Sequence, residues 1–174
     1  MLVIFDVDGT LLGGESHDWA AFDQAIATVL GFTPTVDFFN ALPEITAQAI
    51  AEAAVCASGG AVGSGLERRI CDEYLRRLEE VHTKAPLAFR PRDGVVSLLK
   101  HLPSVPGLSV AIATGDWLTS ISFKLRVAGL DVSAFPIATS SEVRRRSEII
   151  KLAAQRSGRS LSDAIYVGDA SVIA

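Results

Sequence analysis

Residues 2–10 read Leu-Val-Ile-Phe-Asp-Val-Asp-Gly-Thr, a short apolar run followed by two aspartates and a glycine. The apolar part, residues 2–5, is typical of a strand covered on both faces. Gly9 indicates that the chain turns soon after this strand. We therefore expect Asp6 and Asp8 at the carboxyl end of a buried strand.

Two further segments, residues 108–113 and 164–167, show the same short apolar pattern, and residues 135–137 are a weaker candidate because they contain Pro136. Helical spacing of apolar residues separates these segments. It is found in residues 95–102, 117–128 and 141–156. Strands that alternate with helices predict an α/β fold, a Rossmann-like parallel sheet with helices on both faces.

The stretch from residue 14 to residue 90 contains no convincing strand. Three amphipathic helical patterns fill it, in residues 19–30, 45–57 and 66–81. This block is too long for an ordinary crossover between parallel strands. We predict an all-helical cap at 14–90, inserted into a core domain that comprises 1–13 and 91–174.

Polar side chains follow three of the predicted strands: Asp6 and Asp8, then Thr114, and finally Asp169. In open α/β sheets, ligands bind outside the carboxyl ends of the strands. Close carboxylates repel one another, and Mg²⁺ relieves this because it prefers oxygen ligands. Aspartate is also a covalent nucleophile toward phosphoryl groups. A plain turn with an Asx cap would explain an isolated Asp-x-Asp-Gly equally well.

Residues 5–11, Phe-Asp-Val-Asp-Gly-Thr-Leu, resemble the first motif of the haloacid dehalogenase-like superfamily of phosphatases. Residues 113–115 resemble its second motif and residues 167–169 its fourth. The early helical block is similar to the cap of relatives such as phosphoglycolate phosphatase and β-phosphoglucomutase. The resemblance thus extends over most of the chain.

This resemblance implies a role for each matching residue. Asp6 would be the nucleophile and a metal ligand, and Asp8 the general acid/base, with its backbone carbonyl on Mg²⁺. Thr114 would hydrogen-bond the phosphoryl oxygens, and Asp169 would help to hold the metal. The third motif is a basic residue before the last strand; we favour Arg146 over Arg144.

One position departs from the family pattern. The fourth motif usually has a second acid, and here Ile173 stands in its place. Asp116 could contribute a carboxylate instead, or could cap a helix. Of the residues that could face the cleft, we expect surface exposure for His17, Asp18, Arg90 and Arg92, and a core position for Trp19.

Composition and charge argue against nucleic-acid binding, a membrane span and a cysteine metal site. The 174 residues carry a net charge of −4, and the single basic cluster, residues 144–146, is too short to indicate nucleic-acid binding. No apolar run is long enough to span a membrane. Cys56 and Cys71 show no metal-ligand spacing, and we expect both to be reduced thiols in a cytoplasmic protein.

The sequence thus predicts a Mg²⁺-dependent phosphatase that acts on a small phosphorylated substrate through an aspartyl-phosphate. Two alternatives stay open. One is a phosphomutase similar to β-phosphoglucomutase, which uses the same intermediate. The other is a non-catalytic binding domain of the same fold, which the residue at 173 motivates.

Overall fold

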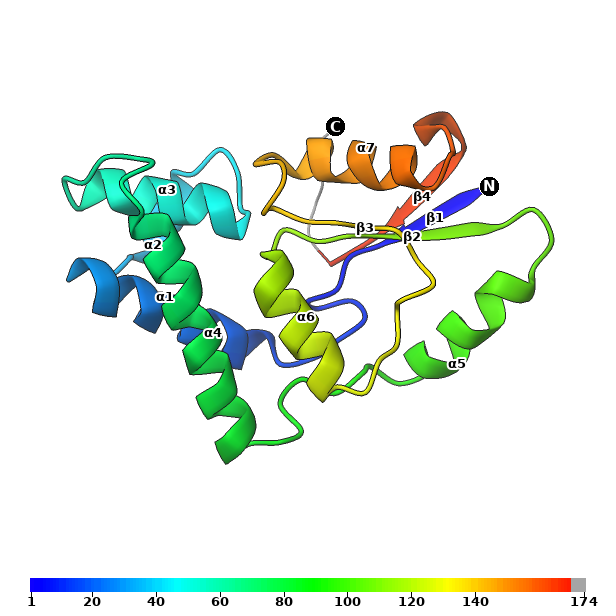
Figure 1. Cartoon of the computed structure of the whole chain (residues 1–174), viewed down its shortest axis with the longest axis horizontal. Helices are drawn as coiled ribbons and strands as arrows, with labels where there is room; N and C mark the ends of the chain where they lie inside the picture. Colours follow the sequence, from blue (N-terminus) through cyan, green and yellow to red (C-terminus); the bar gives the residue numbers. More distant parts are fainter. Residues whose placement is uncertain (170–174) are drawn as a thin grey trace.

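A parallel sheet of four strands, in the order β3-β2-β1-β4, forms the centre of the computed structural model, which describes residues 1–169 (Figure 1). The strands are β1 (Leu2–Phe5), β2 (Ser109–Ala113), β3 (Ile137–Ala138) and β4 (Ala164–Val167). Leu2 pairs with Ser109 on one side and with Ala164 on the other. The predicted parallel α/β fold is confirmed.

Alternate residues of the strands point to opposite faces, as the pleat requires. On one face, Leu2 and Ile4 pack against α7 (Arg146–Arg156). On the other, Phe5 and Ile112 pack with residues of α5 (Val95–His101) and α6 (Leu118–Val127). Figure 1 shows α7 on one side of the sheet and α5 and α6 on the other. Two short 3₁₀ turns, Leu102–Ser104 and Leu161–Asp163, precede β2 and β4.

Two details differ from the prediction. The last strand, β4, is not covered on both faces by described residues, because Ile165 is 51% exposed and Val167 38% exposed at the edge of the sheet. The helix predicted from residue 141 begins at Arg146 instead. Residues 141–145 are turns and bends, and Glu142 accepts from Thr139 there rather than extending the helix.

Four helices lie between β1 and α5, with no strand among the described residues there. They are α1 (Glu15–Leu30), α2 (Val36–Asn40), α3 (Ala47–Ala57) and α4 (Leu66–Lys84), and we call them the four-helix segment. The short α2 was not predicted. Its start is stabilised by Thr35, whose hydroxyl accepts from the amide of Phe38. The exact domain boundaries at 14 and 90 stay predictions.

The four-helix segment has its own apolar core, built from the stripes seen in the sequence. Phe22 of α1, Ile50 of α3 and Tyr74 of α4 belong to one buried cluster that also includes Trp117 and Phe123. The last two residues flank or belong to α6, so the cluster ties the segment to the sheet side of the molecule. Burial of such large side chains contributes about 1.5–3 kcal/mol each.

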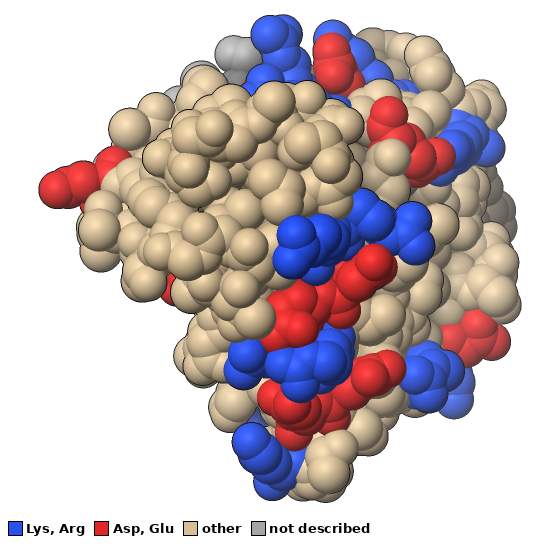
Figure 2. Space-filling view, turned by 60° about the vertical axis from the view of Figure 1, so that its left-hand side comes forward, with Lys and Arg blue, Asp and Glu red and all other residues tan. Residues whose placement is uncertain are grey.

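The outer side of α4 is charged. Figure 2 shows acidic and basic side chains that alternate along this face, beside a broad uncharged area. The alternation fits the ion pairs of α4, in which Arg76 and Arg77 both contact Glu73 and Arg68 contacts Asp72. Among the described helices, none has both the length and the apolar character needed to cross a membrane.

Hydrogen bonds join α3 to the loops beyond the sheet. The amide of Ala47 donates to the carbonyl of Gly115 at 2.7 Å, and the hydroxyl of Thr46 donates to the carbonyl of Arg144 at 2.8 Å. The indole of Trp117 donates to the side chain of Gln48 at 3.0 Å. These contacts hold the start of α3 against the segments that follow β2 and β3.

Candidate active site

The chain turns directly after β1, as expected from Gly9. The amide of Asp6 still pairs with the carbonyl of Val167 at 2.9 Å, and the amides of residues 10–12 then donate to the carbonyl of Val7. Gly9 adopts φ = 77°, and a Cβ at this position would lie 2.0 Å from a carboxylate oxygen of Asp169. Glycine is therefore required both for the turn and for the close approach of Asp169.

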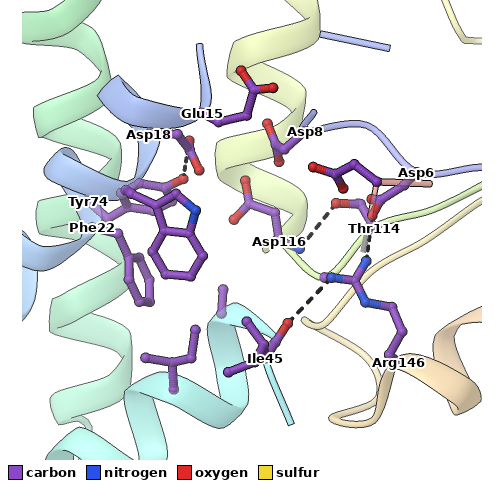
Figure 3. Close-up of a pocket in the computed structure, with 15 residues that line it drawn as sticks. Asp6, Asp8, Glu15, Asp18, Phe22, Ile45, Tyr74, Thr114, Asp116 and Arg146 are labelled. Atoms are coloured by element: carbon purple, nitrogen blue, oxygen red, sulfur yellow. Dashed lines mark hydrogen bonds and ion pairs between the residues drawn. The ribbon is translucent and has the colours of Figure 1, made fainter. Parts of the chain in front are cut away.

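A cavity of about 220 Å³ lies at this edge of the sheet, between the strand ends and the four-helix segment. Figure 3 shows carboxylates converging from several elements, with Arg146 on one side and aromatic and aliphatic side chains on the other. All the site residues predicted from the sequence line this cavity, namely Asp6, Asp8, Thr114, Arg146 and Asp169. Their individual chemical roles stay predictions.

Asp6 is held rigidly by three donors. Its Oδ1 accepts from the amide of Val7 at 2.8 Å, and its Oδ2 accepts from Arg146 Nη1 at 2.8 Å and from the hydroxyl of Tyr166 at 3.1 Å. Burial raises the pKa of Asp6, Arg146 opposes this shift, and the charge of Asp169 adds to it. The carboxylate is thus fixed in orientation and sits in an environment where a cation would stabilise it.

Asp8 shares a buried cation with two other carboxylates. Lys124 of α6 has no exposed surface, and its Nζ lies 2.7 Å from Asp8, 2.8 Å from Asp18 and 2.9 Å from Asp116. Burial disfavours the ammonium, but the three carboxylates outweigh it and raise the pKa of Lys124 well above its ordinary value. Desolvation raises the pKa of Asp8 to about 8, against the opposing effect of Lys124.

Thr114 and Asp116 occupy the end of β2. Thr114 is buried, and its hydroxyl oxygen accepts from the amide of Asp116 at 3.2 Å, which leaves the hydroxyl hydrogen free to donate. Oδ1 of Asp116 accepts from the amide of Trp117 and from Ser120, at 2.6 Å each. Its Oδ2 makes the ion pair with Lys124 without hydrogen-bond alignment. Asp116 therefore binds two residues at the start of α6 and contributes charge beside the cavity, although the N-cap of α6 is Trp117.

The two candidate arginines have different partners. Arg146 contacts Asp6 and also reaches the carbonyl of Ile45 at 3.4 Å. Arg144 forms an ion pair with Glu52 at 2.8 Å, and its side chain is 46% exposed. The geometry places Arg146, and not Arg144, beside the predicted nucleophile.

The sequence also matches a family model. The model described as haloacid dehalogenase-like hydrolase matches residues 3–172. The chain belongs to the haloacid dehalogenase-like hydrolase family. No match was found among curated proteins.

Several solved structures share this fold. A hydrolase from Pseudomonas syringae has a TM-score of 0.74 at 19% identity, covering 97% of this chain and 75% of that one. β-Phosphoglucomutase from Clostridium difficile has a TM-score of 0.70 at 17% identity, with coverages of 97% and 76%. CbbY from Rhodobacter sphaeroides, in complex with phosphate, has a TM-score of 0.66 at 18% identity, with coverages of 95% and 76%. At these identities the likeness establishes the fold.

The oxygen atoms at and near Asp6 are suitable ligands for the Mg²⁺ ion that this family generally uses. The described residues contain no group of three or more His, Cys, Asp or Glu side chains that could hold a metal. Mg²⁺, however, commonly takes only one or two protein carboxylates and completes its shell with water and phosphate oxygens. Asp6 and Asp169 could supply two, and Asp8, whose carboxylate is engaged by Lys124, could supply its backbone carbonyl. Ile173 lies outside the described residues.

Sequence reasoning missed several residues of this haloacid dehalogenase-like site. Lys124 was the most detectable, since a lysine occurs on the apolar stripe of its helix, seven residues after Trp117 and next to Leu125. Tyr166 was treated only as a strand residue. Trp19 was expected in the core but is 42% exposed and lines the cavity, and Asp18, expected at the surface, also lines it. His17 is exposed, as expected.

Proposed function

We propose that this protein is a Mg²⁺-dependent phosphatase that hydrolyses a small phosphorylated metabolite through an aspartyl-phosphate on Asp6. The observation that carries the proposal is the setting of Asp6 at the end of β1. It is buried, held by Arg146 at 2.8 Å, and shares one cavity with Asp8 and Thr114. Membership of a hydrolase family supports the same reaction class.

In the first step, a carboxylate oxygen of Asp6 attacks phosphorus and the bond to the leaving-group oxygen breaks. Asp8, two residues away in the same loop, gives a proton to that oxygen as it departs. The guanidinium of Arg146 and the hydroxyl of Thr114 stabilise the negative charge on the transferring phosphoryl group. Mg²⁺, when bound, neutralises charge on the phosphoryl oxygens.

In the second step, water attacks the phosphorus of the aspartyl-phosphate, and Asp8 takes the proton of that water. Inorganic phosphate leaves, and Asp6 returns to its free carboxylate. Lys124, which Asp18 also binds, holds the carboxyl group of Asp8 in place through both steps. The four-helix segment covers the cavity and limits the access of water before the phosphoryl group has been transferred.

The test is release of phosphate from phenyl phosphate, with and without Mg²⁺. We expect release to require Mg²⁺ and to fall to background in Asp6→Asn. The matched control is Asp37→Asn, at an exposed position of α2 away from the cavity, which should leave the activity unchanged. Activity that persists in Asp6→Asn would contradict the proposed nucleophile.

The same preparation separates the alternatives. A phosphomutase would move phosphate between positions of a sugar phosphate and retain it on the sugar, whereas a phosphatase releases it. If the unmodified protein releases no phosphate from any ester tested, the enzyme proposal fails and a non-catalytic binding domain becomes the better account.

A further inference from the structure

The part of the cavity that faces away from Asp6 has a distinctive chemistry, acidic on one side and apolar on the other. We propose that the substrate is a phosphomonoester whose leaving group carries no second anionic group and packs its carbon part against Trp19, Ile45 and Ile50. This proposal rests on the proposed phosphatase function and adds the class of substrate to it.

The lining of the cavity is predominantly acidic. Six carboxylate residues line the cavity, and Arg146 is the single basic residue among the described residues that do so. The carboxylates are Asp6, Asp8, Glu15, Asp18, Asp116 and Asp169. A phosphoryl group with Mg²⁺ can be accommodated near Asp6, but a second anion further along would lie among Glu15, Asp18 and Asp116, whose cations are already engaged by these carboxylates.

The cations near the cavity already have partners. Arg146 is bound to Asp6 and faces the carbonyl of Ile45. Lys124 is fully buried behind the cavity wall, among its three carboxylates. Arg92 forms an ion pair with Glu15 at the rim. A second phosphate or a carboxylate on the substrate would have to break one of these pairs, and a neutral or cationic leaving group would not.

The other side of the cavity is apolar and could contact the carbon part of the substrate. Trp19 is 42% exposed and Ile45 is 41% exposed, and both line the cavity beside the buried Ile50. The ring of Trp19 packs edge-on against Phe39, with centroids 5.5 Å apart, which fixes the orientation of the indole. Exposed apolar side chains that gather in a concave site are typical of a surface that binds carbon atoms of a ligand.

The experiment compares esters that differ only in a second anion. One pair is hydroxyethyl phosphate and phosphoglycolate, and the other is phenyl phosphate and para-carboxyphenyl phosphate. We expect kcat/KM to be about tenfold or more higher for the uncharged member of each pair, mainly through KM, because the acidic lining repels the carboxylate. The KM should be lower for phenyl phosphate than for hydroxyethyl phosphate, because the ring of phenyl phosphate packs on Trp19.

Two variants test the residues themselves. Glu15→Gln removes one charge from the lining and should reduce, several-fold, the ratio of the two kcat/KM values within each pair. The control Asp37→Asn, at an exposed site, should leave this ratio unchanged. Trp19→Ala should raise KM for phenyl phosphate more than for hydroxyethyl phosphate, and Trp19→Phe, which keeps an aromatic ring, should restore part of the difference.

The outcomes distinguish the two proposals. If phosphate is released but the carboxylated esters react as well as or better than their partners, the substrate class is wrong and the phosphatase function stands. If no ester in the panel releases phosphate, the phosphatase function itself is wrong, and the substrate class falls with it.

Discussion

The ammonium group of Lys124 lies 2.7 Å from Oδ1 of Asp8, although the lysine has no exposed surface. The same Nζ reaches Asp18 of α1 at 2.8 Å. One buried cation therefore joins the loop after β1 to the four-helix segment that covers the cavity.

Replacing Lys124 should destabilise the fold. Lys124→Met keeps most of the length of the side chain but leaves three carboxylates without their shared cation, and we expect the free energy of unfolding to fall by about 3–5 kcal/mol. Urea denaturation measures this. Lys151→Met, at an exposed position of α7, is the matched control and should change the midpoint little. Equal midpoints for both variants would show that Lys124 does not stabilise the cluster.

Arg146 and Arg144 should differ sharply in their effect on activity. Arg146→Ala removes the donor that holds Asp6, and we expect kcat for phosphate release to drop by about 10²–10³-fold. Arg144→Ala removes only an exposed ion pair with Glu52 and should retain most of the activity. Steady-state kinetics on phenyl phosphate decides between them. A larger loss in the Arg144 variant would reverse the assignment.

A single methyl group at Gly115 should disturb the site. A Cβ there would lie 2.6 Å from Nη2 of Arg146, so the guanidinium, whose Nη1 binds Asp6, must shift. We expect Gly115→Ala to lower kcat by up to about 10²-fold, because small misplacements of a catalytic group are costly.

Gly13→Ala is the control, since its Cβ would meet nothing closer than the carbonyl of Arg90 at 3.9 Å. Circular dichroism should show both variants folded; unaltered kcat in Gly115→Ala would indicate that Arg146 has room to adjust.

The Glu73 cluster should make the stability of α4 depend on pH. Hydrogen bonds from Arg76, and then from Arg77, lower the pKa of Glu73 from 4.5 to about 2. Because the pKa is lower in the folded state, this stabilisation is fully present above pH 4.5 and is lost as the pH falls toward 2. The difference in melting temperature between the natural protein and Glu73→Gln should therefore shrink as the pH falls from about 5 to about 2, because Glu73 becomes protonated in this range. A difference that stays constant over this range would exclude the linkage.

Much of the fold could be read from local patterns. The apolar run of residues 2–5 predicts β1 because a strand buried on both faces needs no alternation. The stripes of α1, α3 and α4 predict helices because each buries one face. The start of α7 was misplaced, since local turns at residues 141–145 compete with helical hydrogen bonds and leave no clear mark in the sequence.

The position of Asp6, Asp8, Thr114 and Asp169 at one edge of the sheet was determined by the sequence alone, because parallel strands bring their carboxyl ends together whatever the details of packing. Only the tertiary structure decided that Arg146 rather than Arg144 reaches Asp6, and that Lys124 is buried among three carboxylates. The contacts of Arg146 with Asp6, and of Lys124 with Asp8 and Asp18, join residues more than 100 positions apart, and they are set by how the four-helix segment, α6 and α7 pack around the sheet. Spacing along the chain carries no information about such distances.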